Sequence, residues 1–222
     1  MHSIKHKWIK RILVLFIVIF ISYIIYLNSL VKSQFSSEIE PKDNVVQIQN
    51  LVDDYPKELI NMLLLVEDQS FFNHKGVDFK EILRVLYGYL FEEKELRGAS
   101  TITQQLIKNT LLSRDKTLAR KTDEALMAIL MEMSYDKNFI LERYMNTVYL
   151  AQQGFTAIHG FASGSLHYFD KDVESLNLEE MATLVALLKG PSYYNPVNSP
   201  ERLSRRVEMI LSMHKNYKKI IQ

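Results

Sequence analysis

The chain has 222 residues and carries 27 lysines and arginines against 26 aspartates and glutamates. This near-neutral balance gives no reason to expect nucleic acid as a partner. Because the chain contains no cysteine, disulfides and thiolate metal sites are excluded. Hydrophobic residues make up 47% of the chain, which holds only seven glycines and five prolines. This composition favours a helical domain with a membrane segment over an all-β or disordered chain.

Residues 12–31 form an apolar run that no charged residue interrupts. At about 1.5 Å per residue, a helix of this length covers roughly 30 Å, the thickness of a bilayer core. Four cations precede the run: Lys5, Lys7, Lys10 and Arg11. Since positive flanks stay in the cytoplasm, we expect a cytoplasmic tail over 1–11, a transmembrane helix over 12–31 and the following residues outside. A cleaved signal peptide is the alternative, but the run is long for one and no small-x-small cleavage site follows it.

The polar, non-periodic residues 32–50 are interpreted as a linker, and 51–217 as one domain. Three pairs in this domain have the residue types that begin helices: Asp78 with Glu81, Thr101 with Gln104, and Asn177 with Glu180. Helical periodicity predicts helices over about 59–66, 79–91, 102–112, 116–134, 138–150, 178–188 and 201–217. No strand hairpin pattern stands out, so the predicted fold class is mainly α.

The stretch 83–91 is unusual because it leaves few polar positions before Glu92. One interpretation is a helix that is buried on all sides. The other is an apolar surface that enters the outer leaflet of a membrane beside the anchor. The sequence leaves both interpretations open.

The stretch 67–78 concentrates titratable groups, beginning with the adjacent carboxylates Glu67 and Asp68 and continuing to Phe71 and His74. Glu67 ends an apolar helix face, where a carboxylate suits proton transfer. An ordinary surface glutamate that closes a helix is the alternative. Asp68 suits orienting a neighbour, binding a cation or capping a turn, and His74 suits holding an anionic group or lying in an exposed turn.

A second stretch, 98–109, combines hydroxyls, amides and a lysine: Ser100, Thr101, Gln105, Lys108 and Asn109. Lys108 also belongs to a basic cluster with Arg114, Lys116, Arg120 and Lys121. Lys116, Arg120 and Glu124 share one helical face. Such spacing is usual for a solvated ladder of salt bridges, and it also suits a grip on phosphates with Glu124 close by. The next predicted helix carries a mixed polar and aromatic set: Glu142, Tyr144 and Asn146.

Four stretches, in this order, match the motifs of a known family: 67–78, 98–109, 120–125 and 140–150. The first has the pattern Glu-Asp-x-x-Phe-x-x-His-x-Gly-[Ile/Val]-Asp, and the second Gly-x-Ser-Thr-[Ile/Leu]-Thr-Gln-Gln-Leu-[Val/Ile]-Lys-Asn. Over about 51–215 the chain resembles the family 51 peptidoglycan glycosyltransferases. It is most similar to the glycosyltransferase module of the 1b-type class A penicillin-binding proteins, without the transpeptidase domain. Ala151 and Asp170 depart from the family pattern, which usually has glycine at both places.

The resemblance implies a lysozyme-like helical lobe and a small membrane-facing jaw lobe, separated by a cleft and preceded by the transmembrane helix. The implied substrate is lipid II, a disaccharide-pentapeptide on undecaprenyl pyrophosphate, which is joined to a growing glycan strand in cell wall biosynthesis. The implied location is the inner (cytoplasmic) membrane, single-pass, with the catalytic domain in the periplasm. Other cell-wall synthesis and division proteins are further candidate partners.

By the same resemblance, Glu67 is the general base and Glu124 is the second carboxylate, in the leaving-group half of the cleft. The implied substrate-binding residues are Asp68, Phe71, His74, Ser100, Thr101, Gln105, Lys108, Asn109, Lys116, Arg120, Lys121, Glu142, Tyr144 and Asn146. A divalent cation, Mg or Mn, is the cofactor to consider, with Glu124 as its candidate ligand, and no organic cofactor is expected. Two alternatives stay open: a glycan-cleaving murein hydrolase or lytic transglycosylase, and a non-catalytic anchor that binds lipid II.

Overall fold

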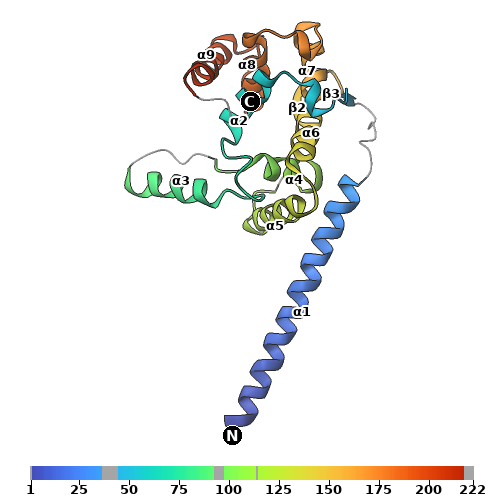
Figure 1. Ribbon diagram of the computed structural model, residues 1–222, viewed down its shortest axis with the longest axis vertical. Coiled ribbons are helices and arrows are strands. Elements are labelled where there is room, and N and C mark those ends of the chain that lie inside the picture. The colour runs from blue at the N-terminus through green and yellow to red at the C-terminus, as the bar shows by residue number, and fades with distance from the viewer. Residues whose placement is uncertain (1, 37–44, 93–97, 114, 218–222) are drawn as a thin grey trace.

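The molecule is mainly helical, as the sequence predicts, and Figure 1 shows its elements. The computed structural model describes residues 2–36, 45–92, 98–113 and 115–217. Its α-helices are α1 (His2–Phe35), α2 (Lys57–Glu67), α3 (Phe79–Phe91), α4 (Ile102–Leu111), α5 (Leu118–Ser134), α6 (Lys137–Thr147), α7 (Phe161–Phe169), α8 (Leu178–Leu187) and α9 (Pro200–Asn216). The shorter elements are the 3-10 helices η1 (Val52–Asp54) and η2 (Val173–Ser175) and the strands β1 (Val45–Gln47), β2 (Tyr149–Gln153) and β3 (Thr156–His159).

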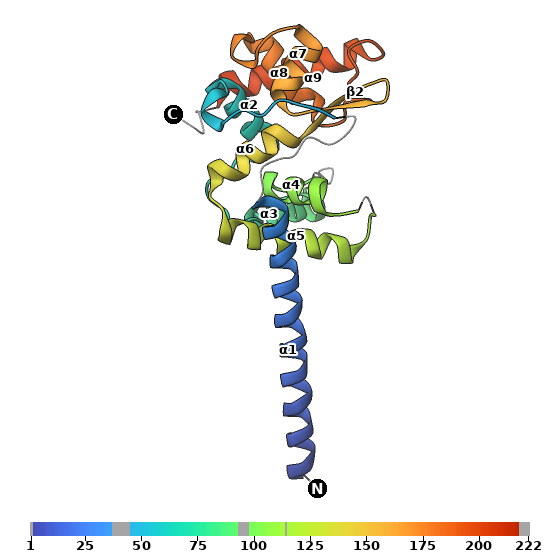
Figure 2. The same cartoon turned by 90° about the vertical axis from the view of Figure 1, so that its right-hand side faces the viewer.

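The helix α1 stands apart from the other elements over most of its length (Figures 1 and 2). Its segment Trp8–Phe35 is long and apolar enough to cross a membrane, with a mean hydropathy of 2.5. Near its end, however, Leu27, Val31 and Phe35 are buried, because α1 packs there against α5 and α4. The last turns of α1 therefore belong to the core of the folded domain.

The structure differs from the predicted linker over 32–50 at both of its ends. The helix α1 continues to Phe35, and residues 45–47 form β1. The middle of the predicted linker, 37–44, lies outside the described residues. Elements of regular structure thus take up both ends of the predicted linker.

The remaining elements form two lobes, which Figure 2 shows one above the other. We call α2, α7, α8, α9 and the strands the distal lobe, and α3, α4 and α5 the proximal lobe, which lies beside α1. The helix α2 packs against α8 and α9 in the distal lobe, where Leu59 and Leu63 are fully buried. The helix α6 contacts both α4 and α7 and so joins the lobes. Because α2 ends at Glu67, the chain leaves the distal lobe at the first predicted motif.

A small sheet in the distal lobe was missed by the sequence analysis. Its strand order is β1-β3-β2, with β1 parallel and β2 antiparallel to β3. The helix predicted over 138–150 instead ends at Thr147, because Val148 has an extended backbone and Tyr149 begins β2. Strands of three to five residues are too short for an alternating pattern to reveal them.

The two departures from the family pattern both lie in the distal lobe. Asp170 ends α7 with a φ of 53°, in the left-handed region that glycine enters most easily. Aspartate tolerates this region better than most residues, so the turn keeps a glycine-like backbone. Ala151 is buried in β2, at an irregularity in the pairing with β3.

The helix α3 carries the unusual apolar stretch. Of the two interpretations of this stretch, a helix buried on all sides is wrong. Gly88 is the buried residue of α3, whereas Leu83, Tyr87 and Phe91 are 66%, 58% and 71% exposed. Figure 1 shows α3 extending sideways from the proximal lobe. An apolar helix face left open in this way favours the other interpretation, contact with a membrane.

We expect Gly160→Ala to lower the free energy of unfolding by about 2 kcal/mol or more, because it combines a strained backbone with overpacking. Gly160 has a φ of +84°, and an added Cβ would lie 2.6 Å from the carbonyl oxygen of Asn146. Gly98→Ala is the matched control, since an added Cβ there meets nothing within 4 Å. Urea unfolding in detergent measures both variants, and equal stabilities would contradict this account of the turn between β3 and α7.

Candidate active site

Glu67, the last residue of α2, is half-buried and is held by an amide. Gln105 of α4 donates from Nε2 to Glu67 Oε2 at 2.9 Å. The hydroxyl of Tyr144 on α6 donates in turn to Gln105 Oε1 at 3.2 Å. Burial raises the pKa of the Tyr144 hydroxyl well above its usual range, so this group stays protonated and donates. The order of these bonds fixes which end of the Gln105 amide faces the carboxylate.

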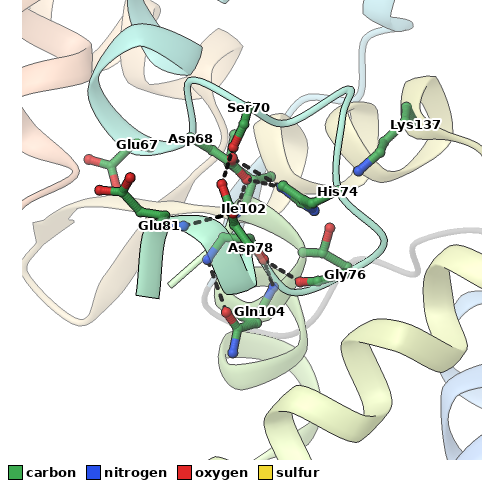
Figure 3. Close-up of polar contacts among 12 residues, drawn as sticks. Glu67, Asp68, Ser70, His74, Gly76, Asp78, Glu81, Ile102, Gln104 and Lys137 are labelled. Atoms are coloured by element: carbon green, nitrogen blue, oxygen red, sulfur yellow. Dashed lines mark hydrogen bonds and ion pairs between the residues drawn. The ribbon is translucent and has the colours of Figure 1, made fainter. Parts of the chain in front are cut away.

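The next residue, Asp68, ties the loop 68–78 to the start of α4 (Figure 3). Its carboxylate accepts from the backbone N–H of Ile102 at 2.9 Å and lies 3.0 Å from Nε2 of His74. Asp68 and His74 are both buried. A buried carboxylate is stable when such partners surround it, and a negative group is favoured at a helix N-terminus.

The loop is also fixed at Gly76, whose carbonyl oxygen accepts from the Thr101 hydroxyl at 2.6 Å. Thr101 and Gln104 form the predicted capping box at the start of α4. Gly76 has a φ of +86°, and an added Cβ would lie 2.5 Å from the backbone of Ala128 in α5. Only glycine fits this approach, so the loop is held between α4 and α5.

Glu124 of α5 is buried under two cations. Its side chain is 1% exposed, Arg120 Nη1 lies 2.6 Å from Oε2, and Lys121 contacts Oε1. Lys121 Nζ also donates to the Ser100 hydroxyl at 2.8 Å. A solvated ladder of salt bridges therefore does not describe Arg120 and Glu124. Their predicted i, i+4 pairing is confirmed, whereas Lys116 precedes α5 and does not share its helical face.

A cavity of about 960 Å³ lies in front of Glu67. It is lined by the end of α2, the loop 68–78, the first turns of α3, the segment 98–101 and Met213 of α9. Of the residues predicted to act on substrate, the lining contains Glu67, Asp68, His74, Ser100 and Thr101. Lys121 reaches this wall through Ser100, which links the Glu124 group to the same cavity.

The structure does not bring all predicted residues to the cavity. Phe71 is fully buried behind the loop. Lys108, Asn109 and Lys116 are exposed and do not line the cavity, and Arg114 lies outside the described residues.

Glu142 and Asn146 hold the chain that enters α2 and are not among the cavity's lining residues. Glu142 accepts from the backbone N–H of Val52 at 3.3 Å, and Asn146 Oδ1 accepts from the N–H of Asn50 and the hydroxyl of Tyr55. Their geometry is that of structural residues, and their predicted contact with substrate has no support from their position.

Two sets of residues at the site escaped the sequence analysis. Lys80, Arg84 and Met213 line the cavity, and Glu132 and Lys137 lie behind His74. For Glu132 the available signal was a single acid within the apolar residues of α5, between Met131 and Met133. For Met213 no sequence signal exists, because folding alone brings α9 to the cavity.

The predicted divalent cation does not fit the side chains around Glu124. Both oxygens of its carboxylate already face cations. The described residues also contain no group of three or more histidines, aspartates or glutamates that could hold a metal ion. We therefore assign no step of the chemistry to a metal.

The chain is similar in sequence to one protein family and to several known proteins. A model of the Transglycosylase family matches residues 33–215. Penicillin-binding protein 1B of Haemophilus influenzae is 41% identical over 178 residues, which cover 80% of this chain and 23% of the relative. Penicillin-binding protein 1B of Vibrio cholerae is 44% identical over 161 residues, covering 72% and 21%. Penicillin-binding protein 1A of Neisseria lactamica is 44% identical over 161 residues, covering 72% and 20%. The chain thus spans about a fifth of the length of these curated relatives.

Tyr144→Phe should free the Gln105 side chain, because Gln105 Oε1 loses the donor that orients it. We expect a loss of about 1 kcal/mol in the free energy of unfolding and a changed side-chain amide signal of Gln105 in NMR spectra. Tyr55→Phe is the matched control, since it removes another buried hydroxyl, one bonded to Asn146. An unchanged Gln105 signal in Tyr144→Phe would show that Tyr144 does not orient the amide.

Proposed function

Because the chain belongs to the transglycosylase family, we propose that it is a peptidoglycan glycosyltransferase that polymerises lipid II into glycan strands. One observation supports this most directly. A half-buried carboxylate, Glu67, and a hydroxyl bonded to a cation, Ser100 with Lys121, line the same cavity. A base and a hydroxyl backed by a cation at the same cavity suit attack on a sugar that carries a phosphate leaving group.

In the proposed reaction, Glu67 takes the proton from the 4-hydroxyl of an acceptor GlcNAc. The oxygen attacks the anomeric carbon of the donor MurNAc, and the bond from that carbon to undecaprenyl pyrophosphate breaks on the opposite face. The α-linked donor thereby becomes a β-1,4 link, and the diphosphate leaves with the bonding electrons. Gln105 donates a hydrogen bond to one oxygen of Glu67, which holds the carboxylate in place for the transfer.

The cations around Glu124 are suited to the leaving diphosphate. Lys121 has a half-exposed side chain that reaches Ser100 at the cavity wall, whereas Arg120 is more buried and pairs with Glu124. Glu124 holds both cations, so its role in this proposal is to orient them. Lys108 and Lys116 are exposed and would attract the diphosphate from solution through longer-range charge.

The membrane anchor and α3 support a substrate that is itself lipid-linked. We propose a single-pass protein with its N-terminus in the cytoplasm and the cavity on the outer side of the inner membrane. In that orientation Lys80, Glu81 and Arg84 of α3 face the cavity, while its exposed apolar residues are free to contact lipid. Other proteins of cell wall synthesis and division are proposed as further partners.

Glu67→Gln should lower the rate of glycan formation from purified lipid II by about 10²–10⁴ while the fold stays intact, since it removes a positioned base. Chain products are measured on gels, and urea unfolding checks the fold. Glu58→Gln, in the first turn of the same helix, is the matched control. Near-normal polymerisation by Glu67→Gln would contradict the assignment of the base. Release of muropeptides from isolated sacculi without any polymer would instead favour a glycan-cleaving enzyme.

A fluorophore on α3 should enter lipid in the full-length protein reconstituted into phospholipid vesicles. The absence of cysteine allows a single label at Phe91→Cys, and Phe155→Cys, at the tip of the hairpin in the distal lobe, is the control. We expect the emission of an environment-sensitive dye at position 91 to shift to shorter wavelength and its fluorescence to be quenched by quenchers attached to lipids. Equal behaviour of the two labels would show that α3 does not enter the bilayer.

A further inference from the structure

Two charged side chains lie behind the loop of Asp68 and His74 and have no assigned role: Glu132 of α5 and Lys137 of α6. Their side chains are 2% and 17% exposed, and Lys137 Nζ lies 2.7 Å from Glu132 Oε2. The Thr103 hydroxyl donates to Glu132 Oε1 at 2.6 Å. Figure 3 shows Lys137 on the far side of His74 from Asp68. Neither Glu132 nor Lys137 lines the cavity.

His74 connects this pair to the site. Its Nε2 lies 3.0 Å from both oxygens of Asp68, and its Nδ1 lies 3.7 Å from Glu132 Oε1. Its ring therefore stands between two carboxylates, in the order Asp68, His74, Glu132, Lys137. Nδ1 is buried and has no hydrogen-bond partner in the described part of the chain, and it faces the carboxylate of Glu132. Because buried charges are costly unless paired, the charges of Asp68, Glu132 and Lys137 each require the neighbouring side chain in this row.

The row ends next to Glu67. Asp68 directly follows Glu67 in the chain and caps the first turn of α4 through the N–H of Ile102. At the other end, Lys137 Nζ also lies 4.4 Å from the ring centre of Phe71, the buried aromatic residue of the loop. One row of polar side chains therefore holds the loop and four helices: α2, α4, α5 and α6. Loss of the inner pair removes the support on which His74 rests.

We propose that Glu132 and Lys137 are positioning residues for Glu67, acting through His74 and Asp68. The proposal rests on the proposed function, because its kinetic test uses the transfer reaction. Since neither residue lines the cavity, their loss should leave substrate binding largely unchanged and should slow the transfer step. A merely structural pair would lower stability and leave the rate of the folded enzyme unchanged.

The test is the double variant Glu132→Gln/Lys137→Met in the full chain, in detergent, with purified lipid II. Removing both charges leaves no buried unpaired charge, so the variant is expected to fold. We expect kcat to fall about tenfold to a hundredfold, with KM within about twofold of wild type, because small displacements of a reacting group cost rates of this size. Lys137→Arg keeps the cation and should keep at least a third of the wild-type kcat.

Glu180→Gln is the matched control, because it removes a carboxylate that pairs with Lys171 and belongs to the capping box of α8, outside the cavity. It should lower Tm and leave kcat unchanged. A folded double variant with wild-type kcat, or a control that loses as much kcat as the double variant, would overturn the proposal.

Hydrogen exchange at the Ile102 amide gives a readout that does not depend on the reaction. Its exchange should quicken at least tenfold in the double variant, because the Asp68 cap loosens when His74 loses its support. Unchanged protection of Ile102 would overturn the positioning role, whatever the kinetics show. Absence of polymer with the wild-type protein would instead count against the proposed function, so the two failures are distinguishable.

Discussion

The buried carboxylate of Asp68 is the constraint on which the site depends. It is 3% exposed and therefore requires partners, which it finds in the first N–H of α4 and in His74. Because Glu67 precedes it directly, satisfying Asp68 also decides where the proposed base lies. The same contact joins the end of α2, which belongs to the distal lobe, to α4 in the proximal lobe. The need of the Asp68 carboxylate for hydrogen-bond partners thus links the packing of the two lobes to the geometry of the cavity.

The two carboxylates assigned to the reaction lie in different surroundings. Glu67 is half-buried and accepts a hydrogen bond from the neutral amide of Gln105. Glu124 is fully buried and pairs with two cations, Arg120 and Lys121. Such a contrast separates a group that exchanges protons from one that organises cations. The division of roles proposed for the pair follows from this difference in environment.

Local sequence signals predicted most of the helices but missed α7 (Phe161–Phe169), and long-range contacts explain why the strands were missed. The capping boxes at Thr101 and Asn177 depend on residues three positions apart, so the sequence displays them directly. β1, in contrast, exists only because it pairs with β3 more than a hundred residues later. Glu67 and Gln105 belong to recognisable motifs, but nothing local shows that they touch. The sequence does not distinguish Glu132 from other helical glutamates, because its proposed role depends on His74, which only folding brings beside it.

The way in which α1 enters the folded domain bears on how deeply the protein would lie in a membrane in the proposed orientation. In the proposed orientation, Arg11 marks the cytoplasmic side, and Leu27 lies about 24 Å further along the helix. Leu27 is already buried against the proximal lobe, although a bilayer core is about 30 Å thick. The long Arg11 side chain can extend toward water and so place its own backbone inside the bilayer core. This reduces the difference between the helix length and the core thickness, but the helix remains short for the core. The underside of the proximal lobe is therefore drawn toward the level of the outer headgroups. At that depth the exposed apolar residues of α3 would meet lipid, and the lipid-linked diphosphate proposed as substrate would reach the cavity without leaving the membrane surface.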